Sequence, residues 1–272
     1  MLNVKMILGT VMGTLLAISP VKASAQAVEL IPYQAGYVVS LSSNSDRSMV
    51  SAVTGKVAFG FEKICGGWLF QQRGNMSNHL PDGNVVPQIF QFSSIEKSGE
   101  YQFSIKTGGT SKDVILGRAE MGGVGESGQV VFSRPEKMTL SLPPNTLFPA
   151  AHTRSMIEAA QAGKRQFERL IFEGTDTNSA KLLVAFVSPM SDAGKAVIAK
   201  MGGKLKSQKG WHFQMAYFDP TDQSGTPVYE VGVDQLDNGI ALRWELDYGS
   251  HAVEMKMVKV QSLVEPDCSA QK

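Results

Sequence analysis

The sequence predicts a mainly β protein: a single large antiparallel sheet curled into a β-spiral or an open, barrel-like sheet, with one or two short helices. Two observations predict it. Apolar and polar residues alternate along many short segments, and glycine-rich turn sequences separate these segments at hairpin-like spacing. Strict alternation gives one inward apolar face and one outward polar face, as in antiparallel strands. A sheet of so many strands needs protected edges, and curling the sheet protects them. A two-sheet sandwich is the alternative fold.

The alternation is clearest in five segments. Their apolar positions are Phe59 and Phe61; Phe90 and Phe92; Tyr101, Phe103 and Ile105; Trp211, Phe213, Met215 and Tyr217; and Ile240, Leu242, Trp244, Leu246 and Tyr248. Between the last two segments, Asp237 to Gly239 reads Asp-Asn-Gly and predicts a hairpin with a type I′ turn. At Met257-Val258 the apolar face changes parity, which predicts a bulge or a corner in the strand.

Two segments have helical rather than strand spacing. In the first, Thr153 is the expected N-cap and Gly163 the expected stop. In the second, Ser191 or Asp192 is the expected cap, and the helix should end at Gly202-Gly203. Both segments lie between strands, so we expect them to plug or cover the curled sheet.

The N-terminus reads as a secretory signal peptide over residues 1–25. Its apolar run is too short to span a bilayer comfortably, and small residues precede a cleavage site after Ala25 or Ala27. An uncleaved membrane anchor is the alternative, and the length of the apolar run argues against it. No later apolar run approaches transmembrane length. We therefore expect an exported, soluble, periplasmic protein with one β-spiral domain over residues 26–272.

Composition and charge narrow the function classes. The chain is 43% hydrophobic and 19% charged, enough for a packed core. Removing the signal peptide takes away Lys5 and Lys22 and no acid, so the formal net charge changes from +1 to −1. This near-neutral balance argues against nucleic-acid binding and suggests no electrostatic attraction to anionic lipid.

The chain has two cysteines, Cys65 and Cys268. In an oxidising compartment, two thiols in one exported domain are expected to form a disulfide, here one that fastens the C-terminal tail to an early strand. The alternatives are two buried thiols, a reactive Cys65 and intermolecular pairing. Neither cysteine has a second Cys or His at metal-ligand spacing, so no metal site is expected.

Signals of catalysis are weak, and we assign no catalytic, cofactor-binding or metal-binding residue. The common nucleophile, zinc and phosphate motifs are missing from the sequence. Asp219 to Gly225 reads as a turn rather than a calcium loop. The four histidines, which read as surface or capping residues, are His79, His152, His212 and His251. Paired carboxylates need no local motif, so an unrecognised hydrolase of envelope polysaccharide stays an alternative.

The large aromatic residues of the predicted inner face allow two interpretations. Phe90, Phe103, Trp211 and Trp244 either fill the interior as ordinary core or line a cavity that holds an apolar ligand. Ordinary core packing favours the first interpretation.

Two longer strings resemble a known family. "GKVAFGFEKICGGWLFQQR", residues 55–73, and "LPPNTLFPAAHTRSMIEAAQAGKRQFERLIFEGTD", residues 142–176, are similar to segments of EipB-like proteins. These are alphaproteobacterial cell-envelope integrity proteins first classed as a domain of unknown function. A cysteine near the C-terminus, here Cys268, fits the same resemblance.

The resemblance implies a periplasmic monomer folded as a many-stranded β-spiral, with a disulfide at Cys65 and Cys268. It also implies a role in keeping the envelope intact under stress, in functional association with a periplasmic tetratricopeptide-repeat protein. It brings no catalytic residue and no cofactor. An analogy of fold with periplasmic carriers of lipoproteins suggests the alternative of a carrier that holds a lipid or acyl chain in a half-open barrel.

Overall fold

The computed structural model describes residues 27–46, 48–109 and 113–269. The predicted signal peptide therefore lies outside the described residues. The described chain forms fourteen strands, two α-helices and one short 3-10 helix. In chain order they are β1 (Tyr33–Asn44), β2 (Ala52–Ile64), β3 (Gly67–His79), β4 (Val85–Lys97), β5 (Glu100–Gly109), β6 (Val114–Glu120), β7 (Gly128–Arg134), β8 (Met138–Leu142), α1 (Pro149–Gln161), β9 (Gln166–Ile171), β10 (Lys181–Pro189), α2 (Asp192–Met201), η1 (Gly202–Leu205), β11 (Gly210–Phe218), β12 (Tyr229–Leu236), β13 (Ala241–Asp247) and β14 (His251–Ser262).

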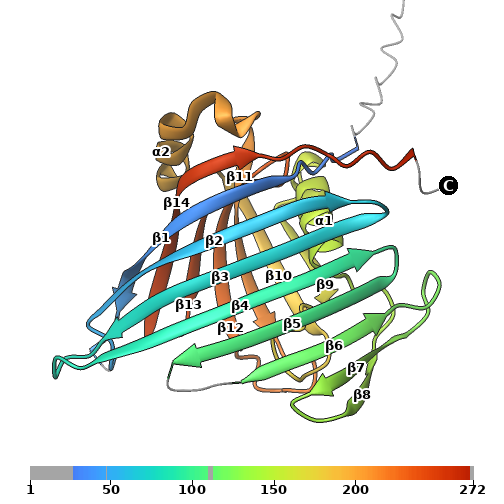
Figure 1. Ribbon diagram of the computed structural model, residues 1–272, viewed down its shortest axis with the longest axis horizontal. Helices are drawn as coiled ribbons and strands as arrows, with labels where there is room; N and C mark the ends of the chain where they lie inside the picture. Colours follow the sequence, from blue (N-terminus) through green and yellow to red (C-terminus); the bar gives the residue numbers. More distant parts are fainter. Residues whose placement is uncertain (1–26, 47, 110–112, 270–272) are drawn as a thin grey trace, which may run out of the picture.

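All fourteen strands belong to one open antiparallel sheet in the order β8-β7-β6-β5-β4-β3-β2-β1-β14-β13-β12-β11-β10-β9. Two meanders, β1–β8 and β9–β14, are joined where β1 pairs with β14. We call them the front half and the back half, because the first crosses in front of the second (Figure 1). The sheet edges are β8 and β9, which α1 connects along the chain. The prediction of a single curled, open antiparallel sheet is confirmed.

The alternation along the strands places one apolar face inside the curl. In β1, Tyr33, Tyr37 and Val39 are each no more than 2% exposed. The predicted parity change in β14 is also confirmed. Gly36 pairs with Lys259 and Tyr37 with Met257, so Val258 bulges out of the ladder.

The turn between β12 and β13 differs from its predicted type. Gly239 has a φ of +88°, but Asn238 is not among the described non-glycine residues with positive φ, so the type I′ prediction is wrong. The Asn238 side chain is buried instead. It donates to the Leu205 carbonyl at 2.8 Å and accepts from the Ile240 amide at 3.2 Å. These contacts with η1 and with the residue before β13 hold the dipeptide in its observed conformation.

The first helix begins earlier than the sequence predicts. Its N-cap is Phe148, which makes no side-chain cap, and Pro149 takes the first helical turn. Thr153, the predicted cap, lies inside the helix. The amides that a cap would satisfy are accepted by a distant side chain, Glu96 of β4. The end of the helix is as expected, with Gly163 just beyond it at a φ of +73°.

The second helix follows the prediction closely. The Ser191 side chain accepts from the Gly194 amide at 3.0 Å, so Ser191 is the N-cap. The helix ends at Met201 with Gly202 as its C-cap, and η1 continues from there.

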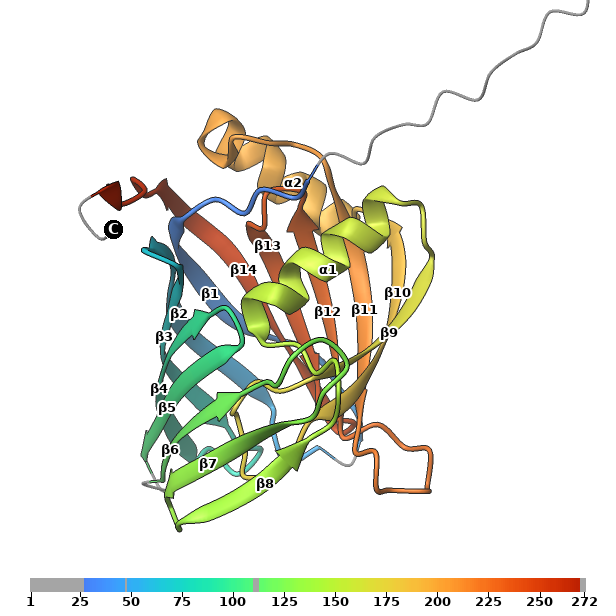
Figure 2. The ribbon, with the colours of Figure 1, turned by 90° about the vertical axis from the view of Figure 1, so that its right-hand side faces the viewer.

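The core has three apolar clusters, and α1 connects them. Ala150 and Ile157 of α1 belong to the cluster that joins the front half, β13, β14 and α2. Met156 and Ala160 pack with the inner face of the back half. Phe148, just before the helix, belongs to the cluster at β5–β8. In the turned view, α1 lies in the opening between the two halves, so it plugs the curled sheet (Figure 2).

Candidate functional site

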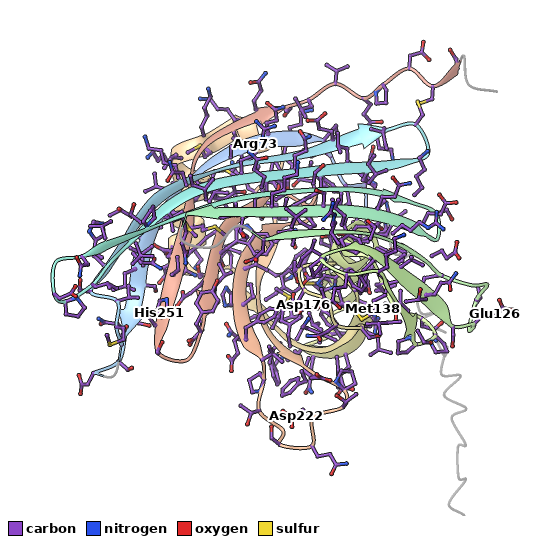
Figure 3. All side chains as sticks on the ribbon, turned by 60° about the horizontal axis from the view of Figure 1, so that its bottom comes forward. Arg73, Glu126, Met138, Asp176, Asp222 and His251 are labelled. Carbon is purple, nitrogen blue, oxygen red and sulfur yellow. A yellow bond between two sulfur atoms is a disulfide. The ribbon has the colours of Figure 1, made fainter. Side chains whose placement is uncertain are left out.

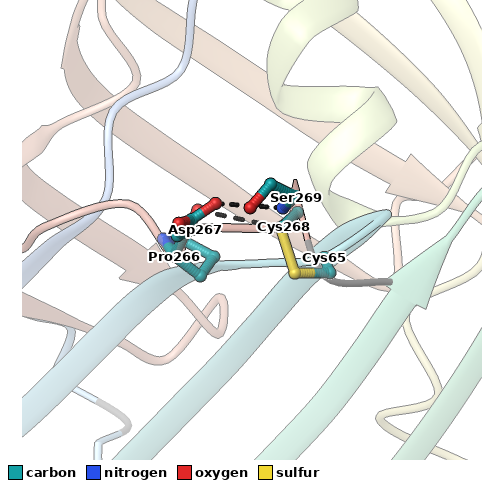
Figure 4. The surroundings of a disulfide bond; sticks show 5 residues. All are labelled: Cys65, Pro266, Asp267, Cys268 and Ser269. Atoms are coloured by element: carbon teal, nitrogen blue, oxygen red, sulfur yellow. Dashed lines mark hydrogen bonds between the residues drawn. A yellow bond between two sulfur atoms is a disulfide. The ribbon is translucent and has the colours of Figure 1, made fainter. Parts of the chain in front are cut away.

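The two cysteines form a bond between the front half and the C-terminal tail. Cys65 lies in the turn between β2 and β3, and Cys268 lies beyond β14, with 5.6 Å between their Cα atoms (Figure 4). Neither cysteine is free. The Cys268 residue is exposed to solvent, so a reductant can reach the bond. The two cysteines are 203 residues apart in the sequence. Their disulfide ties the segment after β14 to the hairpin formed by β2 and β3.

The inner face of the front half carries a row of aromatic rings that are only partly buried. Phe59, Phe70, Phe90 and Phe92 are all half-buried. The ring centroids of Phe59 and Phe70 lie 4.8 Å apart, and those of Phe70 and Phe92 lie 5.3 Å apart. The Phe90 ring lies directly against Gly74, where a Cβ atom would come within 2.0 Å of it. The interior of the front half is thus apolar, and solvent reaches part of it.

The four aromatic residues singled out from the sequence differ in burial. Phe103 is 4% exposed and packs against Phe132 and Phe172, so it fills the interior as predicted. Phe90, Trp211 and Trp244 are half-buried. The sheet therefore leaves part of its inner apolar surface uncovered at these three positions.

Glu96 holds the start of α1 against the front half. Its two carboxylate oxygens accept from the Ala150 amide at 2.6 Å and the Ala151 amide at 2.9 Å. Burial raises the pKa of Glu96, against the opposing effect of the two amides and the Arg154 charge. The sequence signal for this role is parity: Glu96 has the same parity in β4 as Phe90 and Phe92, so a carboxylate stands on an apolar face.

His152 is a buried residue of α1, and the prediction of a surface or capping histidine is wrong here. It is 6% exposed, and its Nδ1 atom has no hydrogen-bond partner. Burial, reinforced by the charge of Arg169, lowers the pKa of His152 to about 3. The ring is therefore neutral near neutral pH. The helix face that carries it turns inward because Met156 and Ile157 on the same helix are buried.

A groove of about 560 Å³ lies between α1, the segment before it and β9. Its charged lining residues are Arg154, Glu158, Glu168 and Arg169. Both carboxylates are on exposed residues, whereas the general acid of a glycosidase needs burial that raises its pKa. Ser155 Oγ accepts from Arg169 Nε at 3.0 Å, which does not activate a hydroxyl as a nucleophile. The groove gives the hydrolase alternative no support.

A serine, a histidine and an aspartate also meet at the start of α2, but not as a catalytic triad. Asp234 Oδ2 accepts from Ser191 Oγ at 2.6 Å, and Asp234 Oδ1 lies 3.1 Å from His212 Nδ1. In a triad the histidine contacts the serine, whereas here the aspartate stands between them. Burial acts to raise the pKa of Asp234, but hydrogen bonds from His212 and Ser191 outweigh it and hold the pKa below its ordinary value. The cluster anchors α2 to the sheet.

The described part of the chain has neither a metal-binding cluster nor a membrane-spanning helix. There, no three or more His, Cys, Asp or Glu residues are grouped so that they could hold a metal ion. Asp219 and Asp222 instead accept from the amides of Thr221 and Ser224 within their own turn, as the turn prediction requires. Nor does any helix among these residues have the length and apolar character to cross a membrane.

The comparisons with known proteins agree with this fold. The family model described as EipB-like matches residues 24–264. The chain is similar to the cell envelope integrity protein EipB of Brucella abortus (strain 2308), with 27% identity over 248 residues, which cover 88% of this chain and 86% of that protein. It is also similar to the crystal structure of a beta-barrel-like protein of the domain of unknown function DUF1849 from Brucella abortus. That match has a TM-score of 0.78 and 24% identity and covers 88% of this chain and all of the other. The chain therefore belongs to the EipB-like family.

Proposed function

We propose that this protein is a non-enzymatic, periplasmic protein that maintains the integrity of the cell envelope under stress by binding a protein or an envelope component. The observation that carries the proposal is the family match over residues 24–264, together with a relative named for cell envelope integrity. The structure is consistent with it. The polar clusters at Glu96 and Asp234 are used to seat helices, and the groove beside α1 lacks an activated nucleophile.

The finer parts of the proposal come from the family resemblance. The signal peptide over residues 1–25 would deliver the chain to the periplasm, where we expect it to be a monomer. The protein partner would be a periplasmic tetratricopeptide-repeat protein. In vivo crosslinking followed by purification through a tagged copy would identify the partner.

Deleting the gene tests the proposed function directly. The deletion strain should lose survival on detergent and on an antibiotic against the cell wall, and a plasmid copy should restore it. A second plasmid carrying the copy without residues 1–25 is the control and should fail to restore survival. Unchanged survival of the deletion strain would contradict the proposal.

A carrier that binds a lipid or an acyl chain is the second candidate. The half-buried inner residues favour it: Phe59, Phe70, Phe90, Phe92, Trp211 and Trp244. A ligand with an apolar chain would cover these rings and stabilise the protein by doing so.

Native mass spectrometry of protein purified gently from cells tests the carrier. A bound lipid mass should appear in the wild type and weaken in Phe90→Asp, which places a charge in the aromatic row. Phe186→Asp is the matched control, because Phe186 of β10 is 52% exposed and lies on the outer face. The carrier is refuted if the wild type carries no lipid.

A further inference from the structure

We propose that the outer face of the front half, together with the adjoining strand β14, is a docking surface for a bilayer of anionic phospholipid. The inference deepens the proposed function, because it names the envelope component and the surface that would meet it. The surface consists of two adjacent rows of outward-facing residues that cross six strands, which we call the basic band.

The register of the sheet assembles the basic band from distant parts of the chain. In the first row, Lys259, Gly36, Ala58, Arg73, Gln91 and Lys106 lie opposite one another on β14, β1, β2, β3, β4 and β5. In the second, Lys256, Val38, Lys56, Asn75, Ile89 and Gly108 do the same. Five strand spacings of about 4.8 Å make the band roughly 24 Å wide. Arg73 projects away from the side chains of the interior (Figure 3).

Most of the cations in the band have no acidic partner. Among the described residues, Lys56, Arg73, Lys106 and Lys259 form no ion pair, and all four are exposed. Only Lys256 is paired, with Glu254 at 2.9 Å. Unpaired cations that share one face produce a positive potential there, even in a chain whose net charge is near zero.

The outer face of the back half has the opposite character along β9 to β13. Its strands carry Glu168, Glu230, Glu245 and Asp247 on the outer side, at positions that alternate with buried inner residues. Arg243, the cation among them, is bonded to Glu245 and Glu254. The outward side chains of the band and those of β9 to β13 therefore differ in the sign of their charge, and an anionic surface would attract the band.

The remaining residues of the band favour a lipid surface over an acidic protein. Small residues, Gly36, Ala58 and Gly108, stand among the cations of the two rows. Val38 and Ile89 are 41% and 46% exposed, and an apolar side chain among cations suits the boundary between headgroups and acyl chains. Neither row contains an aromatic residue, whereas aromatic anchors dominate protein–protein hot spots. Adsorption to many phosphates at once needs only such an array of cations.

Vesicle co-sedimentation tests the proposal. Wild-type protein should sediment with vesicles that contain about one third phosphatidylglycerol in phosphatidylcholine, but not with pure phosphatidylcholine. Binding should fall as salt rises from about 0.05 to 0.5 M, because the Debye length shortens. Each cation is worth a factor of roughly five in partitioning, so Lys56→Glu with Arg73→Glu should weaken binding at least about 25-fold.

The matched control is Lys137→Glu with Lys164→Glu, which makes the same change of net charge at exposed residues outside the band. It should bind as the wild type does to within about twofold. A thermal melt of each variant checks that it folds. Equal losses in both double variants would mean that net charge alone acts, and would overturn the docking surface.

Failure of this inference differs from failure of the proposed function. If the wild type does not bind anionic vesicles, the inference is refuted even where the gene is needed for survival on detergent. Capture of an acidic partner protein by the band, without vesicle binding, would likewise overturn it. If vesicles bind but the deletion strain survives normally, the docking surface stands and the proposed function falls.

Discussion

The front and back halves of the sheet differ in how completely their inner faces are buried. In the front half, β2, β3 and β4 have 13 residues each, whereas β9 to β13 of the back half have 6 to 9. The short strands lie against α1, and Phe213 and Val233 at their centre are fully buried. The long strands keep half-buried rings such as Phe59 and Phe90. Curling a sheet does not by itself bury its inner face; the plugging helix completes the burial where it lies.

The two helices are fastened to the sheet by the same device in opposite halves. Glu96 of the front half holds the first amides of α1, and Asp234 of the back half holds Ser191, the cap of α2. The local sequence supplied a cap for α2 and none for α1. The first turn of α1 therefore depends on tertiary contact, whereas α2 begins where its own residues specify.

The largest expected effect comes from breaking the disulfide that ties the tail after β14 to the front half. Replacing Cys65 or Cys268 by serine should lower the free energy of unfolding by up to about 5 kcal/mol, because the enclosed loop no longer restricts the unfolded chain. Denaturant unfolding of wild type and variants measures it. A reductant should destabilise the wild type, where Cys268 is exposed, and leave both variants unchanged. A wild-type melt that does not respond to reductant would contradict a stabilising role of the disulfide.

Truncating one phenylalanine in each half tests whether the inner face of the back half is more tightly packed than that of the front half. Phe213→Ala in the back half should cost about 3–5 kcal/mol, because it opens a cavity in a fully packed region. Phe90→Ala in the front half should cost clearly less, about 1–2 kcal/mol, because solvent already reaches the ring. Equal losses in urea unfolding would show that the front half is as well packed as the back half.

The buried histidine of α1 makes stability depend on pH. The pKa of His152 is lowered to about 3 in the folded state, so below pH 6.5 the unfolded chain binds a proton that the folded chain does not. The stabilisation is present above pH 6.5 and is lost as the pH falls toward 3. Below pH 6.5 the free energy of unfolding should fall by about 1.4 kcal/mol per pH unit, which gives a loss of about 2.7 kcal/mol between pH 7.5 and 4.5.

His152→Gln removes this titration. Its free energy of unfolding should therefore fall less steeply with acid than that of the wild type, whatever the substitution costs at neutral pH. Urea unfolding at a series of pH values gives both slopes. Parallel curves for the two proteins would contradict a buried, neutral His152.

The smallest expected effect concerns the anchors of the helices. Glu96→Ala should cost about 1 kcal/mol, the usual value of an N-cap, because burial of the carboxylate already offsets part of its hydrogen bonds. Hydrogen exchange should accelerate at the Ala150 and Ala151 amides and stay unchanged in α2. Ser191→Ala is the matched variant and should have the reverse pattern. Accelerated exchange in both helices with either variant would show that the two halves do not act separately.

Local patterns were sufficient for much of this fold. Alternation identified the inner residues of β5 and β11, parity located the bulge at Val258, and Ser191 marked the start of α2. Each of these features depends on side chains within a few residues of one another, so a single sequence contains the signal. The two family-like strings and the pair of cysteines could likewise be recognised without coordinates.

Features that join segments far apart in the sequence could be seen only in the three-dimensional structure. The start of α1 depends on Glu96, 54 residues before Ala150, and the turn at Asn238 depends on Leu205. The basic band exists because the β1–β14 pairing and the register of β1 to β5 bring lysines and an arginine to one face. Composition indicated a near-neutral chain, and alternation predicted a β protein. Long-range strand pairing decided which of its charges share a surface, because register sets the neighbours of every outward side chain.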